Sequence, residues 1–143
     1  MSKKRVLMVD DEVSFTRMTK ITLEVRGQYS VEVVNEPSEA ISAARRFKPE
    51  IILLDFIMPG MDGANVASQF QTEPELRDIP IIFLTATARG EEATRDGLIS
   101  GGYRFLSKPI AVTDLMRCME TCVAEKESHP APDPLATGAA AEP

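Results

Sequence analysis

Three aspartates each follow a short apolar run, and their placement predicts a site that binds a cation. Asp10 and Asp11 come directly after residues 6–9, and Asp55 comes directly after residues 51–54. Apolar runs of this kind are typical of neighbouring strands in a buried parallel sheet, which would bring the three carboxylates to one edge. Like charges at that edge repel each other unless a cation lies between them. Taken alone, the acid pair has an alternative interpretation as the N-cap of a helix.

The ligand chemistry of this cluster favours Mg²⁺. This ion prefers oxygen ligands in octahedral geometry and keeps several waters, so two or three carboxylates and a backbone carbonyl form a suitable half-shell with room for a phosphoryl group. Zinc is disfavoured because no histidine or cysteine lies nearby in the sequence, and calcium because there is no EF-hand loop. The single histidine, His129, lies near the C-terminus and is expected to be solvated.

The elements that would position the acids alternate between strands and helices. Strands are predicted over residues 5–9, 30–34, 51–54, 81–85 and 103–107. Helices are predicted at about residues 38–47, 64–71 and 91–100. The apolar stripe of a first helix would comprise Phe15, Met18, Thr22 and Val25, and that of a last helix Val112, Leu115, Met116, Met119 and Val123. The alternation predicts an α/β doubly wound fold, a three-layer flavodoxin-like sandwich around a five-stranded parallel sheet of order 2-1-3-4-5.

Further groups would join the acids if this strand order holds. Thr85 and Ala86 end the fourth strand, and Lys108 and Pro109 follow the fifth. In a sheet of this order the binding crevice lies at the carboxyl ends of the strands, where the order reverses. A hydroxyl and an ammonium beside three carboxylates complement an anion bound at a metal.

Over about residues 4–125, the chain resembles the receiver domain of bacterial two-component response regulators, the CheY-like family. Five features carry the resemblance: the acid pair Asp10 and Asp11, the Asp-x-x-Met-Pro-x-x-x-Gly run from Asp55 to Gly63, Thr85-Ala86, Phe105 and Lys108-Pro109. Gly63 in that run is expected to adopt positive φ where the chain turns into a helix. The family also implies a cis peptide between Lys108 and Pro109.

The resemblance implies a role for each site residue. Asp55 would be the phosphoacceptor, taking a phosphoryl group from a phosphohistidine on a sensor histidine kinase or a histidine phosphotransfer protein. Asp11, Asp55 and the backbone carbonyl of Ile57 would ligate Mg²⁺, and Asp10 would be held through water. Lys108 and Thr85 would bind phosphoryl oxygens, with Ala86 beside them.

Phosphorylation is expected to act as a switch. In the family, the threonine moves toward the phosphoryl group and the aromatic residue of the fifth strand changes rotamer, which shifts the population between two states. Thr85 and Phe105 would fill these roles here. The surface affected would be that of the fourth helix, the fifth strand and the last helix. The alternative for Phe105 is a plain core position in a strand.

Two other functional classes compete with this interpretation. An Asp-nucleophile phosphohydrolase of the haloacid dehalogenase type would need a second acid two residues after the nucleophile, where this chain has Ile57. A phosphorylation-independent interaction module would be expected to lack some of the acids or the lysine. The favoured interpretation is therefore not an enzyme acting on other molecules, since it would catalyse only its own Mg²⁺-dependent phosphorylation and dephosphorylation.

The composition predicts one globular domain in a reducing, cytoplasmic setting. The 143 residues carry a net charge of -6 and no long basic stripe, which argues against direct nucleic-acid binding. No apolar run approaches a membrane span. Cys118 and Cys122 are expected to be reduced thiols at the edge of a core face. Residues 1–127 would form the receiver domain, and the Pro/Ala-rich residues 128–143 a disordered tail or linker stub.

The output of such a domain is not specified by the sequence. An effector protein or a C-terminal output domain would read the phosphorylated state, and the resemblance also allows a homodimer.

Overall fold

The computed structural model describes residues 3–56, 58, 63–85, 98–100, 103–108 and 110–128, with residues 98–100 and 126–128 described by their backbone alone. The strands are β1 (Lys4–Val9), β2 (Tyr29–Val34), β3 (Ile51–Asp55), β4 (Ile81–Thr85), β5 (Leu98–Ser100) and β6 (Tyr103–Ser107). The helices are α1 (Val13–Val25), the 3₁₀ turn η1 (Pro37–Glu39), α2 (Ala40–Phe47), α3 (Gly63–Gln71) and α4 (Val112–Ser128).

The sheet has the order β2-β1-β3-β4-β6-β5. The first five strands in this order are parallel neighbours, which confirms the predicted arrangement 2-1-3-4-5 with β6 as its fifth strand. The central strands β3 and β4 consist of Ile, Leu and Phe up to their last residues, Asp55 and Thr85, and are buried throughout, as expected of strands that are covered on both faces.

One prediction about the sheet is wrong. The helix expected over residues 91–100 does not reach its predicted end, because Leu98–Ser100 form the short edge strand β5, antiparallel to β6. The connection from residue 100 to residue 103 is as short as a hairpin loop, so these residues can pair directly with the strand that follows. Residues 91–97 of the expected helix lie outside the described residues.

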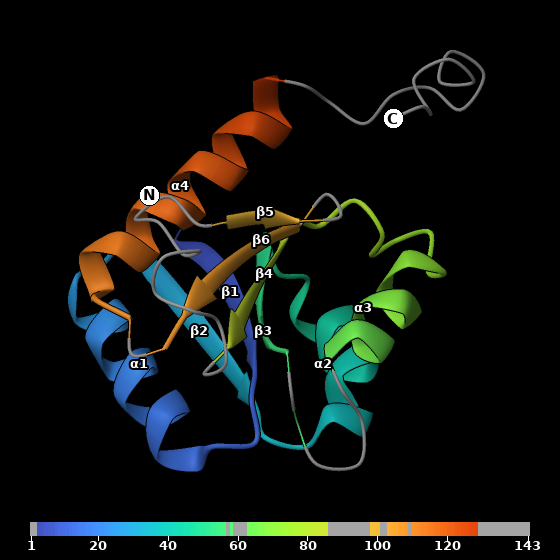
Figure 1. The fold of residues 1–143 in the computed structure, drawn as a ribbon, viewed down its shortest axis with the longest axis horizontal. Helices are drawn as coiled ribbons and strands as arrows, with labels where there is room; N and C mark the ends of the chain where they lie inside the picture. The colour runs from blue at the N-terminus through green and yellow to red at the C-terminus, as the bar shows by residue number, and fades with distance from the viewer. Residues whose placement is uncertain are drawn as a thin grey trace.

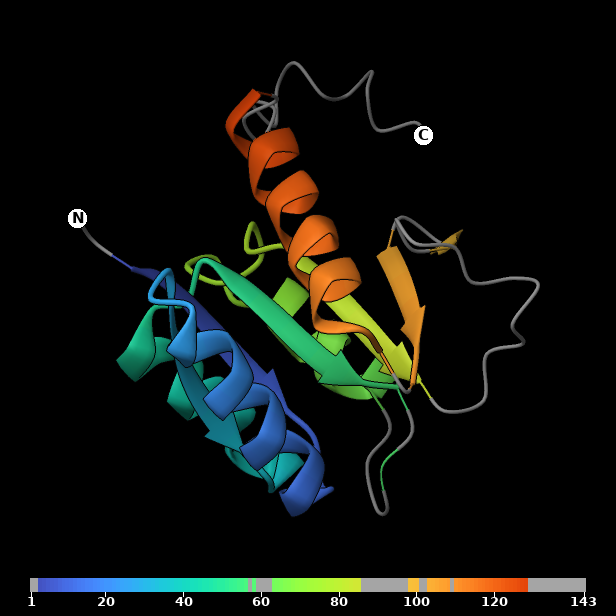
Figure 2. The same ribbon diagram turned by 90° about the vertical axis from the view of Figure 1, so that its left-hand side faces the viewer.

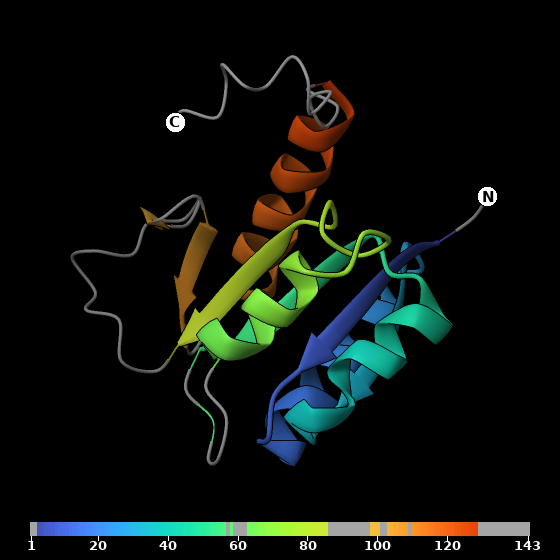
Figure 3. The ribbon, with the colours of Figure 1, turned by 90° about the vertical axis from the view of Figure 1, so that its right-hand side faces the viewer.

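Helices cover both faces of the sheet, as Figure 1 shows. Helices α1 and α4 lie together on one face and are in front in Figure 2, whereas α2 and α3 cover the opposite face and are in front in Figure 3. Each face encloses its own hydrophobic core, since alternate residues of every strand point to opposite sides. The central strands β1 and β3 contribute to both cores, which fixes their carboxyl ends firmly in place.

The apolar stripe predicted for the first helix is not the face that packs on the sheet. Thr16 and Leu23 are the buried residues of α1, while Met18 is 65% and Val25 79% exposed. Apolar residues occur on more than one side of α1, so their periodicity alone did not identify the buried side. Phe15, from the same predicted stripe, does pack against the core.

The stripe predicted for the last helix is confirmed. Leu115 and Met119 of α4 are buried, and Val112, Met116 and Val123 pack against the same core. Cys118 and Cys122 are buried members of this core and form no disulfide.

Helix α4 continues to Ser128, one residue past the predicted end of the domain. The rest of the predicted tail, with His129, lies outside the described residues. Among the helices described, none has the length and apolar character needed to span a membrane.

Candidate functional site

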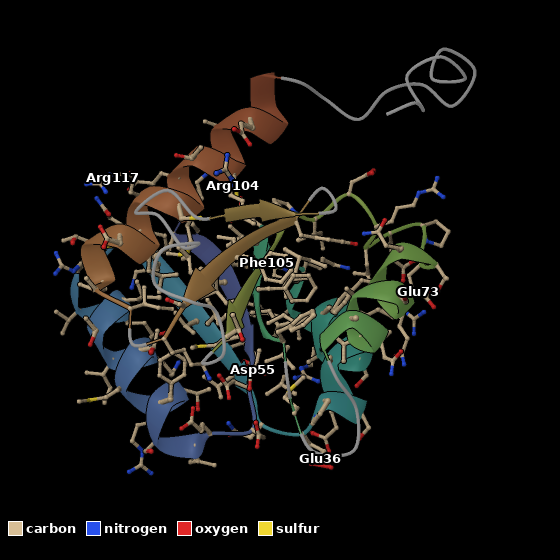
Figure 4. All side chains as sticks on the ribbon, viewed as in Figure 1. Glu36, Asp55, Glu73, Arg104, Phe105 and Arg117 are labelled. Carbon is tan, nitrogen blue, oxygen red and sulfur yellow. The ribbon has the colours of Figure 1, made fainter. Side chains whose placement is uncertain are left out.

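Strand register brings the predicted site residues to one edge of the sheet. Val9 pairs with Leu54, so Asp10 and Asp55 leave adjacent strands at the same level. Thr85 pairs with Ser107, the residue before Lys108, and the Lys108 N–H donates to the Thr85 carbonyl at 2.9 Å. Figure 4 shows Asp55 at this edge, at the lower end of the central strands. The parallel sheet thus gathers residues that are far apart in the sequence.

The three aspartates form a cluster that fits a divalent cation. One carboxylate oxygen from each of Asp10, Asp11 and Asp55 lies within 4.8 Å of the others. Asp10 is fully buried and Asp55 is 6% exposed, so their charges are poorly screened by water. All donor atoms are carboxylate oxygens, the ligand type that suits Mg²⁺ rather than zinc.

Asp10 is held by partners on both sides. Its Oδ1 accepts a hydrogen bond from the Glu12 N–H at 2.9 Å, and its Oδ2 accepts one from Lys108 Nζ at 2.7 Å. The residue that precedes α1 is Glu12, which makes no side-chain capping bond. Neither Asp10 nor Asp11 is therefore the N-cap of this helix, and the capping alternative is wrong.

Asn35, at the end of β2, also helps to position Asp10 and was missed from the sequence. Its Nδ2 donates to the Asp10 carbonyl at 2.8 Å and to the buried Thr16 hydroxyl at 3.0 Å. Asn35 therefore ties the first acidic residue to both β2 and α1. Asn35 follows a strand next to β1 at its carboxyl end, and this position in the sequence could have indicated that it lies near Asp10.

We expect Asn35→Ala to weaken metal binding. The substitution removes both hydrogen bonds and leaves the Asp10 carbonyl without the Asn35 amide donor, so the Mg²⁺ dissociation constant should rise about tenfold, as for other residues that orient metal ligands. Isothermal titration calorimetry measures this directly. Thr121→Ala, which removes a hydroxyl bond to the Arg117 carbonyl on α4, is the control and should leave the affinity unchanged. Equal affinities for Asn35→Ala and the parent would contradict a positioning role.

Lys108 is the cation that balances the acids. Its ammonium lies 2.7 Å from Asp10 Oδ2, 3.1 Å from Glu12 Oε1 and 3.7 Å from Asp55 Oδ1. Burial disfavours the charged ammonium, but the neighbouring carboxylates outweigh it, so the pKa of Lys108 is raised above its usual value. The side chain stays protonated at neutral pH and can bind an anion at Asp55.

Two contacts of Lys108 were not predicted. Glu12 continues the acid run of Asp10 and Asp11 and provides a third carboxylate to the ammonium. Phe15 places its ring centroid 4.4 Å from Lys108 Nζ, which is a cation–π contact. Glu12 and Phe15 are three residues apart at the start of α1, so their spacing was the signal that they could act together.

Gly63 is required at the start of α3, but for a different reason from the one predicted. It does not adopt positive φ; among described glycines that conformation belongs to Gly27. Instead, a Cβ at Gly63 would lie 2.4 Å from the Asp55 carbonyl oxygen and 2.8 Å from Phe56 Cα. The Gly63 N–H donates to the Phe56 carbonyl at 2.7 Å. Helix α3 therefore begins in direct contact with the backbone of the candidate phosphoacceptor.

Phe105 belongs to an aromatic cluster beside the site. Its ring stacks on Phe83 with centroids 4.9 Å apart and meets Phe56 edge-on at 5.3 Å. Phe56 follows Asp55 directly in the chain, and Figure 4 shows Phe105 on β6 above Asp55. Thr85, at the end of β4, is 4% exposed. The two candidate switch residues are therefore on adjacent strands, close to the acidic cluster.

Several predicted site features lie outside the described residues. These are the Ile57 carbonyl, Ala86, and Pro109 with its expected cis peptide.

Comparison with known proteins identifies the family. Residues 6–120 match the family described as "Response regulator receiver domain". The chain belongs to this receiver family. As a receiver, it has the acidic cluster, Thr85 and Lys108 at the carboxyl edge of a parallel sheet, which agrees with the resemblance inferred from its sequence.

Individual relatives show how much of each protein the receiver represents. The chain is 40% identical over 109 residues to the response regulator PleD of Caulobacter vibrioides, covering 74% of this chain and 23% of PleD. It is 30% identical over 129 residues to the DNA-binding response regulator MtrA of Mycolicibacterium smegmatis, covering 90% of this chain and 54% of MtrA. The receiver thus spans about a quarter of one relative and about half of the other.

A solved structure gives the corresponding comparison of folds. The chemotaxis protein CheY4 of Vibrio cholerae superimposes with a TM-score of 0.72 at 27% identity, covering 85% of this chain and 99% of CheY4.

Proposed function

We propose that this receiver is a phosphoacceptor switch in a two-component phosphorelay, with Asp55 as the residue that is phosphorylated. One observation carries the proposal: the Asp55 carboxylate clusters with those of Asp10 and Asp11 and lies 3.7 Å from the Lys108 ammonium. Phosphoryl transfer depends mainly on positioning and charge neutralisation, and this arrangement provides both. No role in catalysis on other molecules is proposed.

The transfer exchanges one bond to phosphorus for another. A carboxylate oxygen of Asp55 attacks the phosphorus of a phosphohistidine, an O–P bond forms, and the N–P bond breaks to leave histidine on the donor. Asp10, Asp11 and Asp55 would hold Mg²⁺, which when bound offsets negative charge on the phosphoryl oxygens. Lys108 needs only a short movement to contact one of those oxygens, since its nitrogen already lies beside Asp55.

The response to phosphorylation would pass through Thr85 and Phe105. A phosphoryl group adds about -1.5 to -2 charges and strong acceptor oxygens, which attract the Thr85 hydroxyl. Movement of Thr85 would change the packing around Phe105 on the neighbouring strand. The surface near β6 and α4 would then differ between the two states and be recognised by an output partner.

The phosphodonor is proposed to be a sensor histidine kinase or a histidine phosphotransfer protein that docks beside α1. The first turn of this helix adjoins the acidic cluster, so a donor must approach across it to reach Asp55. Helix α1 also exposes four apolar side chains, namely Val13, Met18, Ile21 and Val25. Exposed apolar side chains gathered on one helix are typical of a protein contact surface.

Location and output complete the proposal. The two cysteines, which form no disulfide, and the expected kinase partner support a cytoplasmic location. An effector protein or an output domain is proposed to read the switch, because both named relatives are longer than this receiver. Direct nucleic-acid binding is not proposed for the receiver itself, because its net charge is -6.

Phosphorylation at Asp55 can be tested by mass spectrometry. We expect acetyl phosphate with Mg²⁺ to add one phosphoryl group to the parent protein, and we expect Asp55→Asn to remain unmodified because an amide oxygen is a poor nucleophile. The adduct should be released by hydroxylamine, as an acyl phosphate is, and chelation of Mg²⁺ should prevent its formation. An adduct that persists in Asp55→Asn would exclude Asp55 as the acceptor, and no adduct on the parent would refute the proposed function.

A further inference from the structure

Two residues at the start of α1 contact the Lys108 ammonium and do not belong to the cluster of three aspartates. Glu12 Oε1 lies 3.1 Å from Nζ, and the Phe15 ring centroid lies 4.4 Å from it. Glu12 directly precedes the helix and Phe15 lies in its first turn. Together with Asp10 they surround the nitrogen from the side of α1.

With these contacts in place, the Lys108 nitrogen lies beyond hydrogen-bond distance of the Asp55 carboxylate. A lysine ammonium has three donor hydrogens, and those directed at Asp10 and Glu12 make hydrogen bonds of 2.7 and 3.1 Å. The distance of 3.7 Å to Asp55 is too long for a hydrogen bond. Movement of Lys108 toward a phosphoryl oxygen on Asp55 would draw its nitrogen away from Glu12 and Phe15 and lengthen these contacts.

We propose that Glu12 and Phe15 are positioning residues that retain the Lys108 ammonium on the α1 side and slow its engagement with the phosphoryl group. This inference rests on the proposed function, because it concerns the use of Lys108 in phosphoryl transfer. Glu12 acts by charge and Phe15 by the negative face of its ring. Neither residue touches the reacting atoms.

The expected strength of this retention is modest. The Glu12 side chain is 60% exposed, so its ion pair is largely screened, whereas Lys108 is 10% exposed and its contact with the ring is better shielded. Exposed ion pairs and single cation–π contacts each change an equilibrium constant by about twofold to fivefold. Releasing either contact should raise the phosphorylation rate by a factor in that range.

The test compares rate constants for phosphorylation by acetyl phosphate. We expect Glu12→Gln and Phe15→Leu each to react about twofold to fivefold faster than the parent. Phe15→Tyr, which keeps the ring face, should react at the parent rate. Glu36→Gln is the charge control, because Glu36 is an exposed carboxylate near the same edge of the sheet in Figure 4.

A double-mutant cycle with Lys108→Met separates a contact with lysine from a general effect of charge. If Glu12 and Phe15 act through Lys108, their substitutions have no further effect on the rate in the Lys108→Met protein. Rates for the single variants that are unchanged or slower, or accelerations that persist in Lys108→Met, would overturn the proposal. An unmodified parent would instead refute the proposed function.

The contact itself can be measured without phosphorylation. In the parent, the Cε protons of Lys108 should show an upfield NMR shift from the Phe15 ring, which is lost in Phe15→Leu and kept in Phe15→Tyr. If Lys108→Met reacts too slowly for the cycle, the NMR shift tests the contact with Phe15. The comparison of Glu12→Gln with Glu36→Gln then tests whether the effect of Glu12 is more than a general effect of charge. No change of the shift in Phe15→Leu would overturn the proposal.

Discussion

Replacing Lys108 with methionine is expected to lower the free energy of unfolding by about 3 kcal/mol in metal-free buffer, because breaking a buried ion pair leaves an uncompensated charge. Asp10 is fully buried and pairs with the ammonium at 2.7 Å, and Asp55 lies nearby with its own charge. Without lysine, these carboxylates repel each other across a poorly hydrated space. Methionine retains a long apolar side chain, so the loss reports on charge rather than on volume.

Magnesium should restore much of this lost stability. The ion neutralises the same carboxylates and no longer competes with an ammonium, so the variant should bind Mg²⁺ more tightly than the parent and gain more stability at a given concentration. Urea unfolding followed by circular dichroism, with and without Mg²⁺, measures both effects. Lys3→Met, at an exposed position, is the control. A loss below about 1 kcal/mol, the value typical of surface pairs, would contradict this account of the site.

Replacing Gly63 with alanine is expected to lower the free energy of unfolding by about 3 kcal/mol, near the upper end for overpacking a filled site. The added methyl would lie 2.4 Å from the Asp55 carbonyl oxygen, and neither backbone segment can yield as a flexible side chain would. Relief requires α3 or the end of β3 to shift. Because that end carries Asp55, Mg²⁺ affinity should also fall.

Gly27→Ala provides a matched comparison for this prediction. Gly27 has φ of 81° and nothing within 4 Å of the added methyl, so alanine there meets conformational strain without a clash. We expect a loss of about 1 kcal/mol with unchanged Mg²⁺ affinity, since left-handed backbone is mildly unfavourable for alanine. Urea unfolding and calorimetry distinguish the two glycines. Similar losses for both, with Mg²⁺ affinity intact in both, would mean that α3 does not hold Asp55 in place.

The central strands and the acidic cluster could be predicted because their signals are local. A strand buried on both faces must be apolar throughout, so the runs before Asp10 and Asp55 were distinctive. The order of parallel strands then placed Thr85 and Lys108 beside them. These steps needed no knowledge of side-chain packing.

Other features depended on packing that the sequence does not encode locally. The prediction of which side of α1 is buried was wrong, because the polar Thr16 packs inward and the apolar Met18 is exposed. The role of Gly63 comes from a close approach between segments that local periodicity cannot reveal. Likewise, Asn35 matters through its contact with a backbone carbonyl 25 residues earlier in the chain.

The aromatic cluster has a practical consequence for observing this protein in solution. The chain has no tryptophan, so it lacks the usual fluorescent reporter. Phe56 nevertheless adjoins Asp55 in the chain, and its ring lies within 5.3 Å of both Phe83 and Phe105. Rings this close shift one another's proton resonances strongly. A change at Asp55 that moves the Phe56 ring would therefore shift the proton resonances of Phe83 and Phe105 as well. NMR spectra of these three rings can report chemistry at Asp55 without an added label.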